Sequence, residues 1–498
     1  MKLRFRSSLL LLLLVFFSVL PAHAHVGSKD VFQEVHAGPY KLYVTIRPPI
    51  VIPGVATLEV RSSGAALDSI EATPTPMTGE GAEHPPTADV LNRSKDDPNF
   101  YTGSLWLMAN GSWEVRLKMQ GKGGTQMSAI PVAATALSTL KMQRGVAAFL
   151  VVFGIFLVTG MASLIGSIVG EARLPPGERP SLQQQRKGTV ATVVSLLFLA
   201  LLLWFGNAWW NLEAVAASLK IYQPLSLQPI LNGNALRLLV GSPAKAESDG
   251  HEERGTNHDF IPDHGKMMHL YAIREPEMDV AFHLHPALHG SEFDLDLPEM
   301  PAGKYALYGD VVHGNGFPET LVTKLEVRGD MKGAPLAADD GSGRPAPLSA
   351  GMLGNNYRLP DGYSMVWDAP SSLQANTGYE VRFRLLDAQG KDASDVRPYL
   401  GMAGHAAFVK TDGTVFAHVH PGGSAAMAAV MLANGNNDTE MDGMSEMDNM
   451  PGMVMPQQPL SNTVTFPYGF PSVGRYRIFV QMKHGDTVET ATFDAMVH

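Results

Sequence analysis

The sequence predicts a mainly β protein, with three β-sandwiches of immunoglobulin-like type and a two-helix hairpin that crosses a membrane. Short runs that alternate apolar and polar residues recur through most of the chain, and Gly, Pro and Asn separate them, as in sandwich strands. Two longer apolar runs, Gly145–Gly170 and Thr189–Trp210, can each span a bilayer. In the second half, four histidines recur in register, which indicates an internal duplication.

The N-terminal residues 1–24 carry the pattern of a cleaved secretory signal. A basic start is followed by the apolar run Leu9–Leu20 and by the small-residue ending Ala22-His23-Ala24, which is typical of such signals. Cleavage after Ala24 would make His25 the first residue of the mature protein. Residues 25–140 then contain alternating segments such as YKLYVTI and SWEVRLKM, so we expect the first sandwich there, on the export side.

Residues 145–212 are expected to form a transmembrane helical hairpin whose connecting loop is 171–188. That loop contains four basic residues against two glutamates, and a positive excess favours the cytoplasmic side. Both large soluble parts would then lie on the opposite side of the membrane. We therefore expect an integral protein of the bacterial inner membrane, with its soluble domains in the periplasm.

The composition limits the chemistry that the chain can perform. It contains no cysteine, 17 histidines and 25 methionines, which excludes disulfides and thiolate metal sites. Any metal ligands must therefore be histidine, methionine or carboxylate side chains. The formal net charge of −10 and the lack of a basic stripe with interleaved aromatic residues argue against a nucleic acid partner.

The second half is predicted to hold two copies of one histidine-containing sandwich, at 213–330 and 360–498, with the Gly/Pro/Ala-rich residues 331–359 as a linker. Three pairs of motifs carry this inference, and the spacing within each pair is equal. The pairs are Pro262-Asp263-His264-Gly265 before His269 and Pro398-Tyr399-Leu400-Gly401 before His405; His283-Leu284-His285-Pro286 and His418-Val419-His420-Pro421; Gly303-Lys304-Tyr305 before His313 and Gly474-Arg475-Tyr476 before His484.

The second copy places three histidines on one predicted β-hairpin. Asp412-Gly413 is a strong signal for a two-residue turn in which both residues have positive φ. Pairing outward from this turn puts His405 opposite His420, at a Cβ separation of roughly 4.5–5.5 Å. The period of two along a strand puts His418 on the same face. Three imidazoles then converge, which is the beginning of a metal site.

The first copy predicts the same geometry. A turn centred on Glu277 puts His269 opposite His285, with His283 diagonal to it on the same face. The sequence leaves open whether the two hairpins form one bridging site or two separate sites. The candidate ligands are His269, His283, His285, His313 and Met267 in the first copy, His405, His418, His420, His484 and Met402 in the second, and His25 at the mature N-terminus. His264 and His289 lack counterparts in the second copy, so we expect them at the surface.

A methionine-rich tract, residues 425–459, is inserted in the second copy. Its eight methionines are interrupted by Asn, Asp and Gly, unlike a core stripe, so we expect an exposed and disordered segment. Imidazole binds either oxidation state of copper and thioether binds Cu(I), whereas zinc gains nothing from the methionines. The sequence therefore predicts copper, as Cu(I), Cu(II) or both, in preference to zinc.

Two resemblances rest on these motifs. Gly401-Met402-x-x-His405 and the two His-x-His-Pro hairpins resemble the exported YtkA-like modules and related periplasmic copper-binding proteins, over residues 221–498 as two tandem modules. The N-terminal His25 resembles the histidine chelate of CopC-like copper proteins. These resemblances imply copper binding or transfer in the periplasm, for resistance or for supplying a copper enzyme, with that enzyme or a transporter as partner.

Two other functions remain open. A cupin-like metal-dependent enzyme also carries His-x-His on a strand, but it expects a Glu a few residues later, whereas Glu292 lies seven residues after His285. The second copy has no Glu within reach of His420. No nucleophile–base pair or phosphate loop accompanies the motifs, so we expect no enzymatic activity. A structural cell-surface protein would carry serial sandwiches with incidental histidines.

Overall fold

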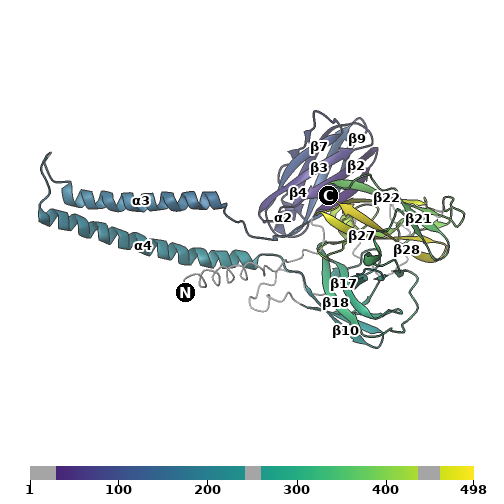
Figure 1. The fold of residues 1–498 in the computed structure, drawn as a ribbon. Coiled ribbons are helices and arrows are strands. Elements are labelled where there is room, and N and C mark those ends of the chain that lie inside the picture. Colours follow the sequence, from purple (N-terminus) through teal and green to yellow (C-terminus); the bar gives the residue numbers. More distant parts are fainter. Residues whose placement is uncertain (1–29, 176, 242–258, 436–459) are drawn as a thin grey trace. The chain divides into compact units, whose positions relative to one another are not determined.

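The computed structural model describes residues 30–175, 177–241, 259–435 and 460–498, and its strands form six antiparallel sheets (Figure 1). This confirms a mainly β fold. The expected signal sequence, His25 and most of the methionine-rich tract lie outside the described residues. The helical unit comprises residues 50–52 and 135–222, and all six sheets belong to a second compact unit. The division of that second unit into three sandwich domains remains a prediction.

The N-terminal part of the chain contributes two sheets. Burial alternates along their strands, since Leu42, Val44 and Ile46 are buried and their neighbours are partly exposed. The order is β1-β2-β3-β7-β6 in one sheet and β5-β4-β8-β9 in the other. The bounds are Val31–Ala37 (β1), Tyr40–Arg47 (β2), Gly54–Ser62 (β3), Leu67–Pro76 (β4), Glu80–Glu83 (the short helix α2), Asp89–Val90 (β5), Asn92–Arg93 (β6), Phe100–Leu107 (β7), Gly111–Gly121 (β8) and Gly124–Ala134 (β9).

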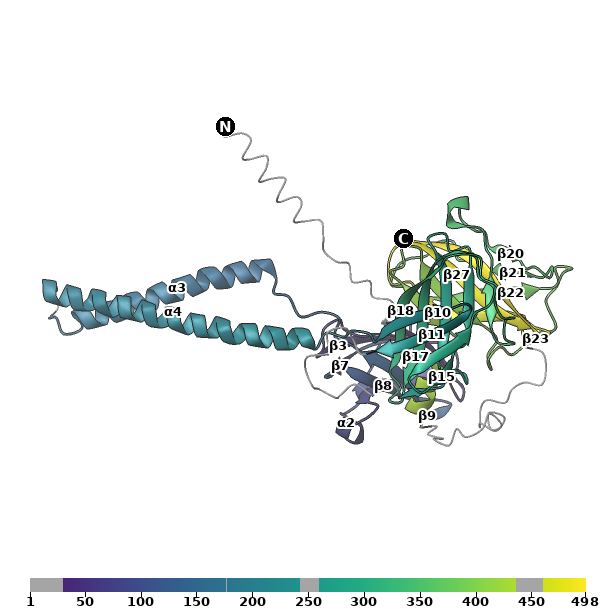
Figure 2. The same cartoon turned by 90° about the horizontal axis from the view of Figure 1, so that it is seen from below.

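The helical unit holds two long helices, Arg144–Glu171 (α3) and Leu182–Leu219 (α4), which contact each other near the loop that joins them (Figure 2). Their mean hydropathies over 18-residue windows are 2.5 and 2.3, so length and composition allow each helix to cross a membrane. The loop is shorter than the expected 171–188. The reason is a capping box at Ser181, which starts α4 seven residues before the apolar run.

The first copy of the repeat forms two sheets around one apolar core. The order is β10-β11-β16-β15 in one sheet and β12-β17-β13-β14-β19 in the other, where β18 also pairs with β17. Phe293 from the first sheet and Leu270 and Leu307 from the second are fully buried in this core. The bounds are Ser226–Asn232 (β10), Ala235–Gly241 (β11), Phe260–Ile261 (β12), His269–Glu275 (β13), Ala281–Leu284 (β14), Ala287–His289 (β15), Glu292–Asp296 (β16), Gly303–His313 (β17), Pro318–Val327 (β18) and Gly341–Gly343 (β19).

The second copy repeats this arrangement. Its sheets have the orders β20-β21-β22-β26 and β23-β27-β24-β25, and β28 pairs with β27. The order β23-β27-β24-β25 matches β12-β17-β13-β14, in agreement with the internal duplication that the motifs predict. The bounds are Asn356–Arg358 (β20), Ser364–Trp367 (β21), Gly378–Leu386 (β22), Val396–Arg397 (β23), His405–Lys410 (β24), Phe416–Val419 (β25), Met427–Ala433 (helix α5), Thr463–Gly469 (β26), Gly474–His484 (β27) and Thr487–Val497 (β28).

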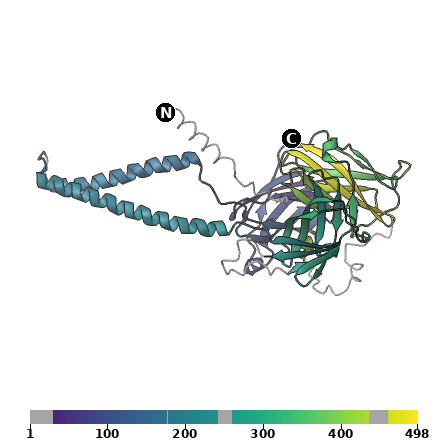
Figure 3. The same cartoon turned by 60° about the horizontal axis from the view of Figure 1, so that its bottom comes forward.

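The two histidine-bearing sheets pack against each other through their outer faces (Figure 1, Figure 3). Residues of β24 alternate between two cores, since Phe408 faces its own sandwich whereas Ala407 and Val409 face the first copy. The rings of Tyr308 and Phe416 stack across this interface with centroids 4.3 Å apart. The interface therefore brings the two histidine hairpins together.

Residues 331–359, expected as a linker, do more than connect the two copies. Gly341–Gly343 pairs with β14 at the edge of the first copy's sheet, and Leu348–Ala350 (η2) forms a short 3-10 helix. A Cβ atom at Gly341 would lie 2.1 Å from Gln481 Nε2 of the second copy. The glycine-rich composition that suggested a flexible connection therefore allows a close approach between backbone and side chain.

Candidate metal centre

The histidine hairpin of the second copy has the predicted register but a different turn. The pairing of Ala407 with His418 continues outward to His405 opposite His420. In the turn, Gly413 has a φ of 74°, whereas Asp412 is not among the described residues with positive φ. The expected two-residue turn is therefore wrong. The N–H of Lys410 donates to the carbonyl oxygen of Val415 at 2.9 Å, and the four-residue loop between them preserves the register.

The first copy carries the equivalent hairpin. Leu270 of β13 pairs with Leu284 of β14, and this register puts His269 opposite His285, as predicted. His283 pairs with Tyr271, and their rings stack with centroids 4.1 Å apart and an interplanar angle of 8°. The aromatic face of Tyr271 thus supports one side of the His283 ring.

A tight turn of the same shape precedes each hairpin. Asp263 and Lys266 exchange two backbone hydrogen bonds, and so do Tyr399 and Met402. The residues that follow Asp263 and Tyr399 are His264 and Leu400, with φ of 52° and 49°. Histidine is one of the few non-glycine residues enriched in this left-handed region. At this position of the duplicated turn, the first copy therefore has a histidine side chain and the second copy has a leucine.

Seven histidines from both copies gather between the two sheets. Group one comprises His269, His283 and His418, and group two comprises His264, His405 and His420; within each group the ligand atoms lie within 4.8 Å of one another. His285 lies beside group one, with its ring centroid 4.6 Å from that of His283. Each group takes residues from both copies, because His418 joins histidines of the first copy and His264 joins those of the second. Neither hairpin forms a group by itself.

The hydrogen bonds around His269 and His283 fix which ring nitrogens carry protons. His269 Nε2 lies 3.1 Å from the carbonyl oxygen of Asp263, so this nitrogen is the protonated donor. His283 Nδ1 lies 2.7 Å from Gln481 Oε1 and 3.1 Å from the Tyr399 hydroxyl. That hydroxyl donates its own proton to a backbone carbonyl oxygen at 2.9 Å. Both neighbours of His283 Nδ1 therefore accept, and His283 Nδ1 is protonated.

The two remaining nitrogens face each other with lone pairs. His269 Nδ1 and His283 Nε2 are 3.1 Å apart, and neither carries a proton in these tautomers. A proton between them would make one ring cationic, but burial and the neighbouring imidazoles lower the pKa of both rings well below the usual value. A metal ion bound here would satisfy both lone pairs. Metal–imidazole bonds of about 2.0–2.1 Å allow two nitrogens at this separation to bind one ion.

Acidic side chains orient two further rings. His285 Nδ1 lies 2.9 Å from Asp340 Oδ1, and His418 Nδ1 lies 3.4 Å from Asp310 Oδ2. Neither Nε2 has a hydrogen-bond partner among the described residues, and such outer partners typically hold one nitrogen so that the other can bind a metal. Asp310 pairs with the first residue of β13, and Gln481 pairs with the first residue of β24. These two positions are equivalent, so each copy orients a histidine of the other copy.

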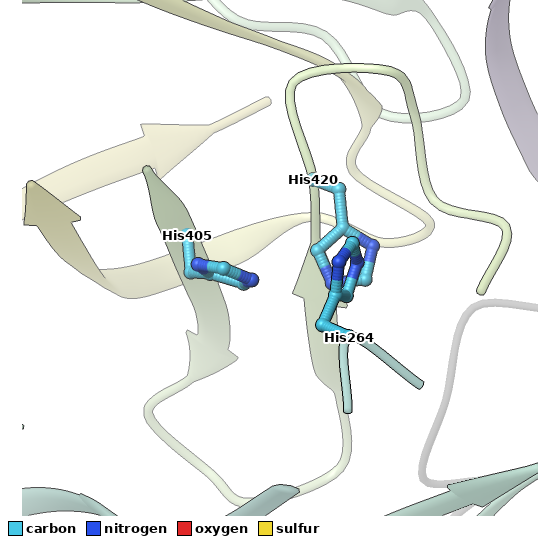
Figure 4. A group of neighbouring side chains, drawn as sticks. All are labelled: His264, His405 and His420. Carbon is cyan, nitrogen blue, oxygen red and sulfur yellow. The ribbon is translucent and has the colours of Figure 1, made fainter. Parts of the chain in front are cut away.

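Group two consists of buried rings that lack partners. Both ring nitrogens of His405 and of His420, together with His264 Nε2, are buried without a hydrogen-bond partner in the described part of the chain. The Ala425 backbone lies near His420 but not in hydrogen-bonding geometry. Figure 4 shows the three side chains directed toward one another. Leaving a buried polar group unsatisfied costs about 1–3 kcal/mol, so this arrangement favours a bound ligand.

We predict that the metal-free protein loses stability as the pH falls. Burial, in most cases reinforced by neighbouring rings, lowers the pKa of six histidines from 6.5: His264, His269, His283, His285, His405 and His420. Below about pH 6.5, and down to the lowered pKa of each ring, the unfolded chain binds the proton and the folded chain does not. The free energy of unfolding therefore falls by about 1.4 kcal/mol per pH unit for each such ring. Urea unfolding at several pH values measures this slope, and a midpoint independent of pH would contradict it.

Among the predicted histidine ligands, His313 and His484 do not belong to the cluster of seven histidines. His313 is held between Asp259 and Glu319, at 2.8 and 3.0 Å from its two ring nitrogens. Burial opposes protonation, but the hydrogen bonds to these carboxylates raise the pKa of His313, which makes it an ion-pair partner rather than a free ligand. His484 belongs to a third set of possible ligands whose donor atoms lie within 4.8 Å of one another: Asp361, His484 and Glu489.

The two predicted methionine ligands, Met267 and Met402, lie outside the regular strands. Met267 packs against the apolar core of the first copy, because β13 begins only at His269 and strand alternation does not extend to Met267. Met267 as a metal ligand therefore stays a prediction. Met402 lies in the tight turn before His405 and remains a candidate. His289 is exposed as expected, with 70% of its side-chain surface accessible.

The sequence missed several functional candidates. His264 was expected at the surface, but its Nε2 is buried in group two. The partners Asp340, Tyr399 and Gln481 were also missed. The available signal was the repeat itself, because His264 occupies a turn position that both copies share, next to a glycine in each.

Tyr399→Phe is expected to weaken metal binding by about 10-fold. Loss of a residue that orients a ligating histidine typically lowers metal affinity by about 10- to 100-fold, and this is the lower end of that range. The change removes the Tyr399 hydroxyl, which is one of the two acceptors of the His283 Nδ1 proton, and keeps the aromatic ring of residue 399. Competition with a chromophoric chelator measures the affinity. Tyr468→Phe is the matched control, since Tyr468 is equally buried and its hydroxyl has no hydrogen-bond partner within the described ranges. Unchanged affinity in Tyr399→Phe would contradict the assigned tautomer.

A family model described as a domain of unknown function (DUF8832) matches residues 358–498, which is the second copy and less than half of the chain. No match was found among curated proteins.

Alignments to solved structures are distant. A bacterial ice-binding adhesin aligns at 7% identity and a TM-score of 0.15, over 93% of this chain and 99% of the adhesin chain. Latent PorU from Porphyromonas gingivalis aligns at 8% identity and a TM-score of 0.15, over 94% of this chain and 34% of that chain. Salmonella alpha-2-macroglobulin aligns at 8% identity and a TM-score of 0.19, over 96% and 24%. The chain spans about a third or less of the last two proteins, and such scores carry no inference.

Proposed function

We propose that this is a membrane-anchored copper-binding protein of the bacterial periplasm, which acts in copper homeostasis or delivery. One observation carries the proposal: the lone pairs of His269 Nδ1 and His283 Nε2 meet at 3.1 Å in a buried, neutral environment, with His418 within reach. Without a cation this contact is repulsive, and with one it becomes a three-imidazole site. Outer hydrogen bonds hold the rings in that orientation before any ion arrives.

Copper is favoured over zinc by the methionines. Met427–Ala433 (α5) forms the described start of the methionine-rich tract, and the Ala428 N–H donates to Asp263 Oδ1 at 2.8 Å. The carbonyl oxygen of the same aspartate accepts from His269. The tract is thus anchored on a residue that orients a ligand. Thioethers bind Cu(I) and imidazoles bind both oxidation states, which supports transfer of copper between the tract and the histidines.

The proposal includes an anchor in the inner membrane. Its support is the length and hydropathy of α3 and α4 and the basic loop residues Arg173 and Arg179, which favour a cytoplasmic turn. The six sheets would then lie in the periplasm as three sandwiches, two of them similar to YtkA-like modules. A copper enzyme or a transporter would receive or supply the ion.

Copper retention by the full-length protein in detergent tests the proposal. The wild-type protein is expected to retain copper through desalting, in at least one oxidation state. A triple variant, His269→Ala, His283→Ala and His418→Ala, should retain less. His289→Ala is the control, because that histidine is exposed and outside both groups. Loss of all copper from the wild type in both oxidation states would refute the proposal.

A further inference from the structure

We propose that the histidine cluster is a two-ion copper centre, in which His264, His405 and His420 bind a second ion beside the one in group one. The inference rests on the proposed function, because both groups offer the same ligand type to the same metal. It gives His264, whose equivalent position in the second copy is Leu400, a role as a ligand. It also assigns the chemistry of group two: a three-imidazole site for copper.

The number of histidines exceeds what one ion can use. A metal ion of this class binds about four ligands, so a single ion would leave at least three of the seven rings unused. Group two alone contains five ring nitrogens that are buried without a hydrogen-bond partner among the residues that the structure describes. His405 and His420 are 0% and 4% exposed. These rings are placed where a polar ligand must compensate their burial.

The two groups are separate sets of three histidines. The two groups share no residue, and in each the donor atoms lie within 4.8 Å of one another. The groups are nevertheless adjacent, because the ring centroid of His405 lies 5.1 Å from His420 in its own group and 5.4 Å from His418 in the other. The arrangement therefore fits two neighbouring ions better than one ion that moves between sets.

The difference between the copies explains why His264 is needed. His285 and His420 are equivalent in the repeat, but the carboxylate of Asp340 contacts His285, whereas His420 turns to group two. His405 and His420 alone provide two ligands, and the turn at His264 supplies the third. Helix α5 holds this turn in place, since Asp263 Oδ1 accepts a hydrogen bond from the Ala428 N–H.

Copper(II) stoichiometry of the full-length protein in detergent tests the inference. Copper(II) is used alone because thioethers bind it poorly, which leaves the methionine-rich tract out of the count. The informative variant is His264→Leu, since Leu400 adopts the same backbone conformation at the equivalent position. His283→Leu removes a ligand of group one, and Leu400→Ala is the control. Atomic emission after desalting counts copper per chain, and circular dichroism checks that each variant folds.

The expected result is a loss of one copper per chain in His264→Leu, a loss of one in His283→Leu, and a loss of two in the double variant. The electron paramagnetic resonance signal of the wild type should be broadened by two interacting ions, and His264→Leu should give the sharper signal of an isolated ion. No loss in His264→Leu, or a double variant that loses only one copper, overturns the two-ion centre and leaves the proposed function standing. A wild type that binds no copper(II) overturns the two-ion centre, and a wild type that binds copper in neither oxidation state overturns the proposed function as well.

Discussion

Arg477→Met is expected to lower the free energy of unfolding by about 3–5 kcal/mol, because it leaves a buried carboxylate without its main partner. Arg477 and Asp494 are both 0% exposed and form two hydrogen bonds of 2.9 and 3.0 Å. A third nitrogen of Arg477 donates to three carbonyl oxygens, those of Glu277 and Met278 in the first copy and that of Ala346 in the connecting segment. The residue therefore joins the two copies. Chemical unfolding of the metal-free protein measures the loss.

Arg384→Met is the matched control for this variant. Arg384 also pairs with an aspartate, Asp368, but both side chains are exposed by more than a third. Such pairs contribute about 0–1 kcal/mol, so this variant should unfold nearly as the wild type does. If Arg477→Met were no less stable than Arg384→Met, the buried pair would not hold the copies together.

Phe416→Ala is expected to cost about 3–5 kcal/mol and to weaken copper binding at the same time. Phe416 is fully buried between the two sheets. Its ring stacks on Tyr308 at 4.3 Å and meets the edge of Tyr271 at 5.4 Å, and Tyr271 in turn stacks on the proposed ligand His283. A cavity at this position therefore loosens both the packing of the sheets and the support of His283.

Phe293→Ala separates these two effects. Phe293 is equally buried, but in the first copy's own core rather than between the copies. We expect a similar loss of stability with copper affinity close to that of the wild type, measured by chelator competition under conditions where both variants are folded. Equal affinity losses in the two variants would mean that the interface between the sheets has no special role in binding.

Much of the local geometry could be predicted from the sequence. The strand period of two and the spacing of the motifs were sufficient to place His405 opposite His420 and His269 opposite His285, because register depends only on counting from a turn. The predicted register is correct although the predicted turn type is wrong. The loop at Asp412-Gly413 has four residues with positive φ only at Gly413, and it keeps the same strand residues paired.

The grouping of the histidines could not be predicted, because it depends on contacts between the copies. The period of a strand does not predict that the outer face of one sheet packs on the outer face of another. The apolar residues on both faces of β24 and β13 did indicate that both faces of these strands are buried. Across this interface the ring centroid of His418 lies 5.0 Å from that of His269, and the ring centroid of His264 lies 5.5 Å from that of His405. The orienting residues Asp310 and Gln481 also act across this interface.

The mixed groups link ion binding to the pairing of the two copies. An ion that binds residues of both copies stabilises only the paired state, and by mass action the stabilisation grows with the ion concentration. The reciprocal roles of Asp310 and Gln481 make the interface self-complementary, like the isologous interface of a symmetric dimer. Two features break that symmetry: His264, which has Leu400 at its equivalent position, and α5, whose Ala428 N–H donates to Asp263.

Anomalous diffraction at the copper edge, from crystals of the copper-loaded full-length protein, tests the site most directly. We predict copper between the two histidine-bearing sheets, bound by His269 and His283 of the first copy and His418 of the second. Copper bound only within a single hairpin, such as by His405, His418 and His420 alone, or no copper between the sheets, would contradict this account.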